Sequence, residues 1–71
     1  MRDAWIISIG TELALGQTLD TNAAWIAARL TDAGVRTVGH VTVADDAARI
    51  TQALTRAAAD CGLVVVTGGL G

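Results

Sequence analysis

The sequence predicts an α/β protein in which three strands and two helices alternate, beginning and ending with a strand. Residues 4–9 and 63–66 are nearly continuous apolar runs bounded by glycines, which is typical of strands covered on both faces in a parallel sheet. Residues 35–43 alternate instead: the odd positions are mainly apolar or small, and the even positions are mainly polar. That pattern is typical of a half-exposed strand near a sheet edge. Two stretches with helical spacing separate the three strands.

The first helix is expected over residues 22–33. Asp20 or Thr21 can cap its start, and Gly34 stands where a helix commonly ends. Trp25 flanks the stripe expected to face the sheet and is expected to pack against a neighbouring segment or a second subunit. That stripe comprises Ala23, Ile26, Ala27, Leu30 and Ala33.

The second helix is expected over residues 47–61, with Gly62 at its end. Asp45 or Asp46 can cap its start. The lone cysteine falls on the stripe expected to face the sheet, so it is interpreted as a core residue. That stripe comprises Ile50, Leu54, Ala57, Ala58 and Cys61.

The connections between the three strands predict the topology. Right-handed crossovers give a parallel sheet, and the apolar character of residues 4–9 places the first strand between the other two. Residues 67–71 form a glycine-rich segment that normally leads into a further helix. We therefore expect residues 1–71 to be the N-terminal, incomplete part of a single larger domain.

Composition excludes several classes of function. A net charge of −2, with five arginines and no lysine, leaves no basic footprint for nucleic acid. No apolar run approaches the ~20 residues of a membrane span. The N-terminus lacks a signal-peptide pattern, and a single cysteine fits a reducing compartment, so a cytoplasmic protein is expected. The expected partner is a small molecule or another protein subunit.

Ligands of open parallel sheets bind beyond the carboxyl ends of the strands. Residues 10–21, 44–46 and 67–71 are expected there. The first of these segments is longer than the roughly 2–6 residues common in such loops, which favours a binding loop over the alternative of an ordered structural loop. It is not a P-loop, because five residues separate Gly10 from Gly16 and a glutamine follows. Its candidate hydrogen-bonding side chains are Thr11, Glu12, Gln17 and Asn22.

The other two segments suggest an anion and a cation site. In residues 67–71, backbone N–H groups can turn toward a phosphate or pyrophosphate, although a tight turn without ligand has the same pattern. Asp45 can hold Mg²⁺ or a similar divalent metal ion, or it can simply cap the second helix. Glu12 can be a second metal ligand or a catalytic base, or a solvated side chain.

The remaining polar and aromatic residues predict no chemistry. His40 is expected to be an exposed strand residue rather than a catalyst, and Trp5 is expected in the core. We expect no set of serine, histidine and aspartate to assemble, and one cysteine with one histidine cannot form a zinc site.

Several motifs together resemble the competence/damage-inducible protein A (CinA) family. The resemblance rests on residues 6–13, 15–17 and 20–22, then on residues 42–46 and 65–71. It identifies the chain with the start of the family's N-terminal, molybdopterin-binding-like domain. The implied fold is a three-layer α/β sandwich with a mainly parallel sheet, as in molybdenum-cofactor biosynthesis proteins.

The resemblance also implies a function. In the CinA family this domain is associated with metal-dependent pyrophosphatase activity on ADP-ribose-like dinucleotides, and in its relatives the glycine loop contributes to binding a pterin phosphate. A non-catalytic molybdopterin- or nucleotide-binding module and a structural fragment without ligand are the alternatives. The full-length protein is expected to be a homo-oligomer.

By position, the resemblance places Asp45 near the divalent metal, while the catalytic residue stays unknown, with Glu12 as the candidate that the residues themselves offer. An acidic pair of the family follows the glycine loop and so lies beyond residue 71, which implies that this chain alone is inactive. The substrate-binding positions implied are Gly10, Thr11, Glu12, Asn22, Thr67, Gly68, Gly69 and Gly71.

Overall fold

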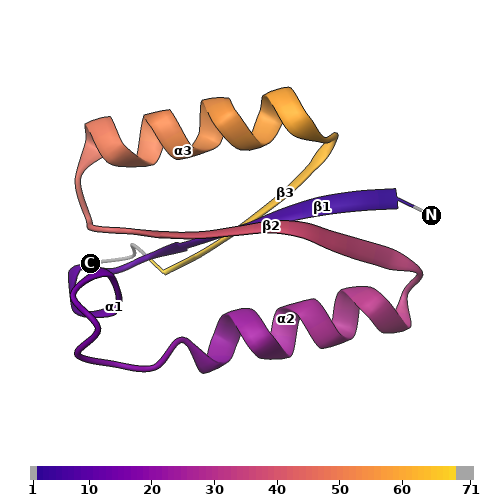
Figure 1. Cartoon of the computed structure of the whole chain (residues 1–71), viewed down its shortest axis with the longest axis horizontal. Helices are drawn as coiled ribbons and strands as arrows, with labels where there is room; N and C mark the ends of the chain where they lie inside the picture. Colours follow the sequence, from indigo (N-terminus) through magenta and orange to yellow (C-terminus); the bar gives the residue numbers. More distant parts are fainter. Residues whose placement is uncertain (1, 69–71) are drawn as a thin grey trace.

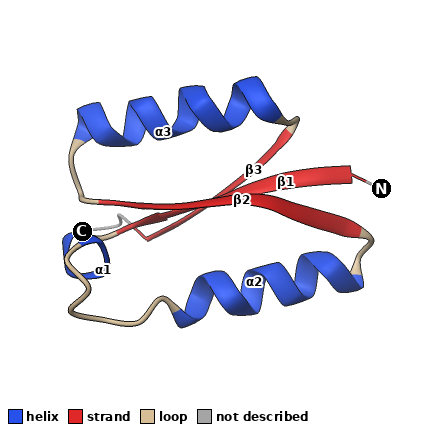
Figure 2. Cartoon of the chain, in the orientation of Figure 1, coloured by secondary structure: helices blue, strands red, loops and turns tan. Residues whose placement is uncertain are grey.

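A computed structural model describes residues 2–68 and confirms the predicted α/β class. The elements in order are β1 (Arg2–Ile9), α1 (Thr11–Ala14), α2 (Thr21–Asp32), β2 (Val35–Val43), α3 (Ala47–Asp60) and β3 (Leu63–Gly68). The strands form one parallel sheet in the order β2-β1-β3, so the first strand is central, as predicted. Helix α3 covers one face of the sheet and α2 the other, which gives three layers (Figure 1; Figure 2). None of the helices described between residues 2 and 68 combines the length and apolarity needed to cross a bilayer.

The central strand β1 supplies most of the core. Ile6 and Ile7 are almost completely buried, and their side chains point to opposite faces because successive strand residues alternate. Ile7 and Ile9 pack against the alanines of α3, whereas Ile6 faces α2. Burying such a side chain contributes about 1.5–3 kcal/mol, so this strand holds the two helices on the sheet.

A β-bulge interrupts the pairing of β2 with β1. Ala4 pairs with Thr37 and Trp5 pairs with Gly39, so Val38 is an extra residue without a partner on β1. One extra residue reverses the alternation of the strand. The predicted half-exposed strand near a sheet edge is confirmed, because β2 is an edge strand whose odd positions are less exposed than its even positions up to Val41. The bulge means, however, that these odd positions do not all face the same side of the sheet.

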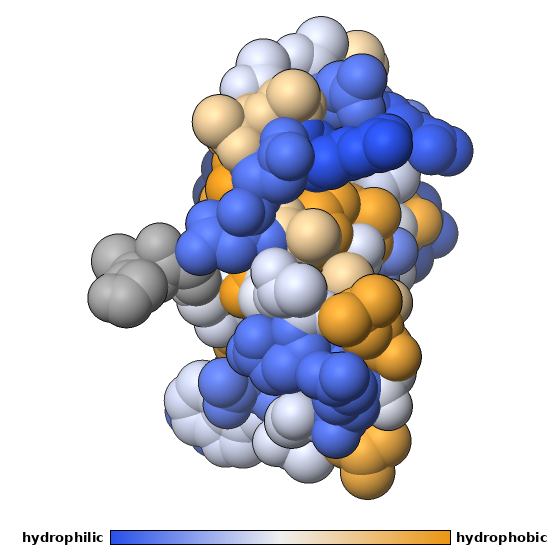
Figure 3. Space-filling view, turned by 90° about the vertical axis from the view of Figure 1, so that its left-hand side faces the viewer, coloured by the Kyte–Doolittle hydropathy of each residue, from blue (hydrophilic) through white to orange (hydrophobic). Residues whose placement is uncertain are grey.

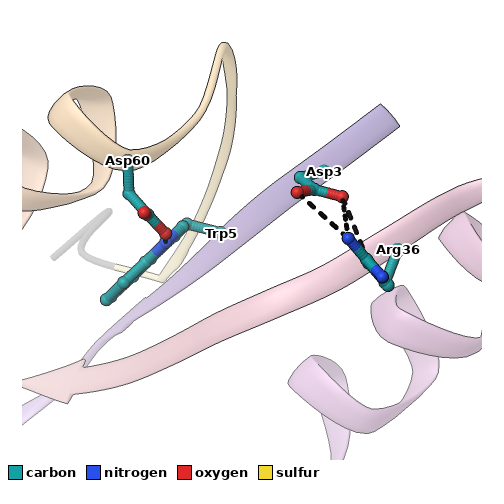
Figure 4. A network of polar contacts seen from close by, with 4 residues as sticks. All are labelled: Asp3, Trp5, Arg36 and Asp60. Atoms are coloured by element: carbon teal, nitrogen blue, oxygen red, sulfur yellow. Dashed lines mark hydrogen bonds and ion pairs between the residues drawn. The ribbon is translucent and has the colours of Figure 1, made fainter. Parts of the chain in front are cut away.

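Gly39 is needed at the bulge because a side chain there would overlap the indole ring of Trp5. Trp5 is only partly buried, and its Nε1 donates a hydrogen bond to Asp60 Oδ2 at 2.6 Å, at the end of α3 (Figure 4). In the same view, Arg36 of β2 donates to both carboxylate oxygens of Asp3 at 3.2 and 3.4 Å. An exposed ion pair of this kind contributes at most about 1 kcal/mol, so the pairing of β1 with β2 depends mainly on the backbone ladder.

Helix α2 begins and ends at the residues that its sequence signals indicate. The Asp20 carboxylate accepts the Ala23 N–H at 3.1 Å, and Gly34 follows the helix with a φ of 81°. The predicted stripe faces the sheet except for Ala33, which is exposed. Trp25 is 66% exposed, with the Arg29 guanidinium 6.0 Å from its ring centroid. Its packing against a second subunit stays a prediction.

Helix α3 is turned relative to the predicted orientation: Ile50 and Ala57 face the sheet as predicted, but Leu54 and Ala58 do not. Ala53 and Ala57 are buried, whereas Leu54 is 39% exposed and Ala58 is exposed. Ile50, Ala53 and Ala57 are spaced i, i+3 and i+7, so they lie on one face of the α-helix. Because two of these residues are alanines, the helix can lie close to the sheet, and the larger Leu54 is turned toward its side.

Candidate functional site

The carboxyl ends of the three strands meet at one edge of the sheet. Ile9 of β1 pairs with Val43 of β2 and with Gly68 of β3, and the Gly10 N–H donates to the Val43 carbonyl at 2.9 Å. The segments that follow β1 and β2 therefore lie together with the end of β3, at the end of the molecule where Figure 1 places α1. In the view onto this end, hydrophilic and hydrophobic residues are interleaved (Figure 3).

A cavity of about 280 Å³ lies at this edge, between the ends of β1 and β3 and the segment that leads into α2. It brings together four of the predicted substrate-binding residues: Glu12, Asn22, Thr67 and Gly68. Gly10 and Thr11 do not line it, and Gly69 and Gly71 lie outside the described residues. The other lining residues, which sequence reasoning did not assign to ligand binding, are Ile9, Leu13, Thr18, Leu19, Asp20 and Thr21.

The predicted loop after β1 is not wholly irregular, because α1 occupies its first turn. Gly10 is buried, and a Cβ added there would lie 2.8 Å from Glu12 Oε1. The Glu12 carboxylate thus folds back over Gly10 at the cavity. Gly16 ends this turn with a φ of 74°, and the following residues up to Leu19, which is 85% exposed, form the outer wall.

Gly68 brings the end of β3 close to β1. Its φ is 84°, in the left-handed region that side chains disfavour, and a Cβ there would overlap the carbonyl oxygen of Ile9. Thr67 pairs with Ser8 and lines the cavity one residue earlier. The glycine at this position therefore fixes how Thr67 and the end of β3 approach the cavity.

Asp45 lies outside the cavity. Its backbone N–H donates to Thr11 Oγ1 at 3.3 Å, at the start of α1. Asp46 is the cap of α3, since its Oδ1 accepts the N–H groups of Ala48 and Arg49 at 2.9 and 3.2 Å. Within residues 2–68, no three histidine, cysteine, aspartate or glutamate side chains are grouped as metal ligands. The metal role of Asp45 stays a prediction.

A partly buried polar cluster adjoins the cavity on the α2 side of the sheet. Ser8 is fully buried, and its Oγ lies 3.1 Å from His40 Nε2. The same nitrogen lies 3.3 Å from Asp20 Oδ2. The expectation that no serine, histidine and aspartate assemble is therefore wrong, because the bulge at Val38 turns His40 toward α2. A buried serine in an otherwise apolar strand was the available signal.

This cluster is not a catalytic triad. A triad uses both ring nitrogens of its histidine, one toward the nucleophile and one toward the carboxylate, whereas Ser8 and Asp20 contact the same nitrogen of His40. Ser8 is also shielded from solvent, so no substrate reaches its hydroxyl. The cluster can hold its members in place, but it cannot relay a proton from serine to aspartate.

Asp20 is the charged member of the cluster. Burial raises the pKa of its carboxyl, but hydrogen bonds from Ser8 and the Ala23 N–H, together with the charge of His40, outweigh burial and hold the pKa below its ordinary value. The Oδ2 atom is shielded from solvent and has no partner of good hydrogen-bond geometry, although His40 Nε2 is close. This contact is an ion pair only when the His40 imidazole is protonated.

Residues 5–71 match the family model described as a "probable molybdopterin binding domain". A CinA-like protein of Geobacter sp. (strain M21) is 53% identical over 66 residues, which are 93% of this chain and 16% of that protein. A CinA-like protein of Salinibacter ruber is 48% identical over 68 residues, or 96% of this chain and 16% of that protein. This chain thus spans only a small part of the length of these relatives.

A solved structure has the same fold. The crystal structure of the protein CinA with unknown function from Thermoplasma acidophilum matches with a TM-score of 0.94 and 38% sequence identity. The match covers 99% of this chain and 41% of that one. The three-strand arrangement and its two covering helices are therefore shared with a larger chain.

Proposed function

Since this chain belongs to the family of the probable molybdopterin binding domain, in the form that CinA-like proteins carry, we propose that it binds the diphosphate part of an ADP-ribose-like dinucleotide. The observation that supports the proposal is the cavity at the strand ends. It combines the hydroxyl of Thr67, the amide of Asn22 and the backbone at Gly68 on adjacent walls. These groups are hydrogen-bond donors of the kind that phosphate oxygens accept.

The position of α2 adds to this set of donors. The helix spans 12 residues and begins at Thr21, beside the cavity. N–H groups at the start of a helix carry a partial positive charge that favours anions. Asp20 uses one of these N–H groups, that of Ala23, so the donors available to a ligand are those nearer the first residue of the helix.

The charges at the cavity require a cation for this binding. The lining includes the carboxyl groups of Glu12 and Asp20 and contains no arginine or lysine. A diphosphate beside these carboxylates is repelled unless a positive charge lies between them. Mg²⁺ commonly binds through one or two carboxylates together with substrate phosphates and water, so Glu12 fits as its protein ligand. Asp20 is already held by Ser8 and His40.

A pyrophosphatase reaction in the longer protein is part of the same proposal. Water would attack one phosphorus, the P–O–P bridge would break, and ADP-ribose would give AMP and ribose 5-phosphate. A divalent metal supplies neutralisation of the diphosphate charge and lowers the pKa of bound water. Because Glu12 is proposed to hold the metal and Asp20 is held in the cluster, neither of the carboxylates described at the cavity is free to accept the proton of the attacking water.

A non-catalytic site for a pterin phosphate is the second candidate, and the description of the matching family model favours it. The same phosphate donors serve both ligands. The two candidates differ in charge, because a pterin with one phosphate does not carry the bridging diphosphate on which pyrophosphatase chemistry depends.

Magnesium dependence of binding tests the proposal. We expect the Kd of the chain for ADP-ribose, measured by titration calorimetry, to be at least about tenfold lower with Mg²⁺ than with EDTA, since the cation separates two negative groups. Glu12→Gln is expected to remove most of that difference. Asp32→Asn, at an exposed carboxylate on the far end of α2, is the control and should keep it.

The comparison of ligands decides between the candidates. Equal affinity with and without Mg²⁺, or an unchanged magnesium effect in Glu12→Gln, contradicts the proposed arrangement. Binding of a pterin monophosphate without binding of ADP-ribose supports the second candidate. Binding of neither ligand assigns the cavity a structural role only.

A further inference from the structure

The carboxylate of Asp20 occupies a wall between two cavities. It lines the cavity at the strand ends, and it also lines a second cavity of about 230 Å³ between α2 and the sheet, together with Thr37 and His40. Its two oxygens have different partners. Oδ1 accepts the Ala23 N–H at 3.1 Å, and Oδ2 faces His40.

The contacts of Asp20 join the segment before α2 to the sheet. Ser8 comes from the central strand and His40 from β2, so the cluster links two strands to the start of a helix. The residues on either side of Asp20, from Thr18 to Asn22, line the cavity at the strand ends. Any movement of the Asp20 carboxylate therefore moves the wall that carries Asn22.

We propose that Asp20 is a positioning residue for the ligand cavity, and that Ser8 and His40 hold its carboxylate so that the segment from Thr18 to Asn22 keeps its place. Protonation of His40 strengthens this hold, because the imidazolium then faces a carboxylate. The identity of the ligand rests on the proposed function. The positioning of the segment from Thr18 to Asn22 also applies to the chain without ligand.

The charges around His40 indicate that this residue controls how firmly the Asp20 carboxylate is held in place. The elements packed around it contribute Ser8 from β1, Thr37 from β2 and the alanines of α2, all of them uncharged. Asp20 is the single charged residue among these neighbours, and its depressed pKa keeps it ionised well below neutral pH. Glu12 lies on the other cavity, with Asp20 between it and His40.

A change of pH should therefore be transmitted from His40 to the cavity. The side chain of His40 is 40% exposed, so its pair with Asp20 is partly screened and the expected effect is modest. We expect the affinity for ADP-ribose with Mg²⁺ to rise roughly two- to fivefold between pH 8 and pH 6. The bridging diphosphate of ADP-ribose does not titrate in this range, so the ligand itself does not cause the change.

Asp20→Asn separates the charge of this residue from its capping role. Asparagine caps a helix about as well as aspartate, so α2 is expected to keep its start, while the attraction to His40 is lost. The pH dependence should disappear in Asp20→Asn and equally in His40→Gln, with no further loss in the double variant. Asp46→Asn is the matched control, because Asp46 caps α3 in the same way without a histidine beside it.

The measurement without ligand keeps the two proposals apart. In ¹⁵N-labelled chain, the amide signals of residues 18–22 should shift with the same pH midpoint as the His40 ring, and this response should vanish in Asp20→Asn and in His40→Gln. That response, together with no ADP-ribose binding, supports the positioning role and contradicts the ligand assignment. Amide signals that ignore the His40 titration, or a pH response that Asp20→Asn preserves, overturn the positioning role.

Discussion

Replacing Gly68 by alanine is expected to weaken ADP-ribose binding about tenfold or more and to lower the free energy of unfolding by about 1–3 kcal/mol. Gly68 has a φ of 84°, and a Cβ at this position would overlap the carbonyl oxygen of Ile9. The overlap involves backbone on both sides, so it cannot be relieved by turning a flexible side chain. The end of β3 must move away from β1, and Thr67 moves with it.

Gly62→Ala is the matched control for this change. It lies just before β3, no atom lies within 4 Å of its added Cβ, and its φ is outside the left-handed region. We expect it to be neutral or slightly stabilising, because alanine restricts the unfolded chain. Chemical denaturation gives the free energies and calorimetric titration gives the affinities. Equal behaviour of Gly68→Ala and Gly62→Ala would show that the end of β3 does not shape the cavity.

The second large effect is expected for Ala57→Leu in α3. Ala57 is completely buried against Ile7 and Ile9, so three added carbon atoms must push the helix from the sheet. Overpacking of this kind costs about 1–3 kcal/mol. The neighbouring Ala58→Leu places the same side chain on an exposed position and should change the free energy of unfolding by less than about 0.5 kcal/mol.

This pair of substitutions distinguishes two orientations of α3. The sequence pattern predicts that both alanines face the sheet, whereas the structure buries only Ala57. The midpoint of urea unfolding, followed by circular dichroism, measures the difference. Equal destabilisation by the two substitutions would restore the orientation that the sequence suggests.

The three strands and the helices α2 and α3 could be predicted because their signals are local. Apolar runs mark the strands, Asp20 and Asp46 cap the helices, and Gly34 ends α2. The face of α3 could not be predicted in the same way. Leucine is more hydrophobic than alanine, so the periodicity placed Leu54 rather than Ala53 in the stripe, whereas the close approach of the helix to the sheet favours the smaller side chain.

The bulge in β2 explains why the polar cluster was missed. Val38 is an extra residue in β2, and the Trp5 ring of β1 lies where a side chain at position 39 would be. The local sequence of β2 does not indicate this bulge. The reversed alternation then carries His40 to the side of Ser8 and Asp20. A contact between residues from three elements depends on register, which a single sequence does not specify.

The position of the candidate site could be predicted, but only some of the residues that line it could be. The carboxyl ends of parallel strands share one edge, so Glu12, Asn22 and Thr67 were expected together. Asp45 was expected there for the same reason. It lies beside Thr11 instead, because α1 begins directly after β1 and occupies the space near the end of β2.

A titration of the ¹⁵N-labelled chain with ADP-ribose in the presence of Mg²⁺ tests most directly whether a diphosphate binds at the strand ends. We expect the largest shifts for the amide signals of Glu12, Asn22, Thr67 and Gly68. The indole N–H signal of Trp5, which lies away from the cavity beside Asp60, should stay unchanged. Saturating ADP-ribose that leaves the four amide signals in place, or that shifts the Trp5 indole most, would contradict a diphosphate site at the strand ends.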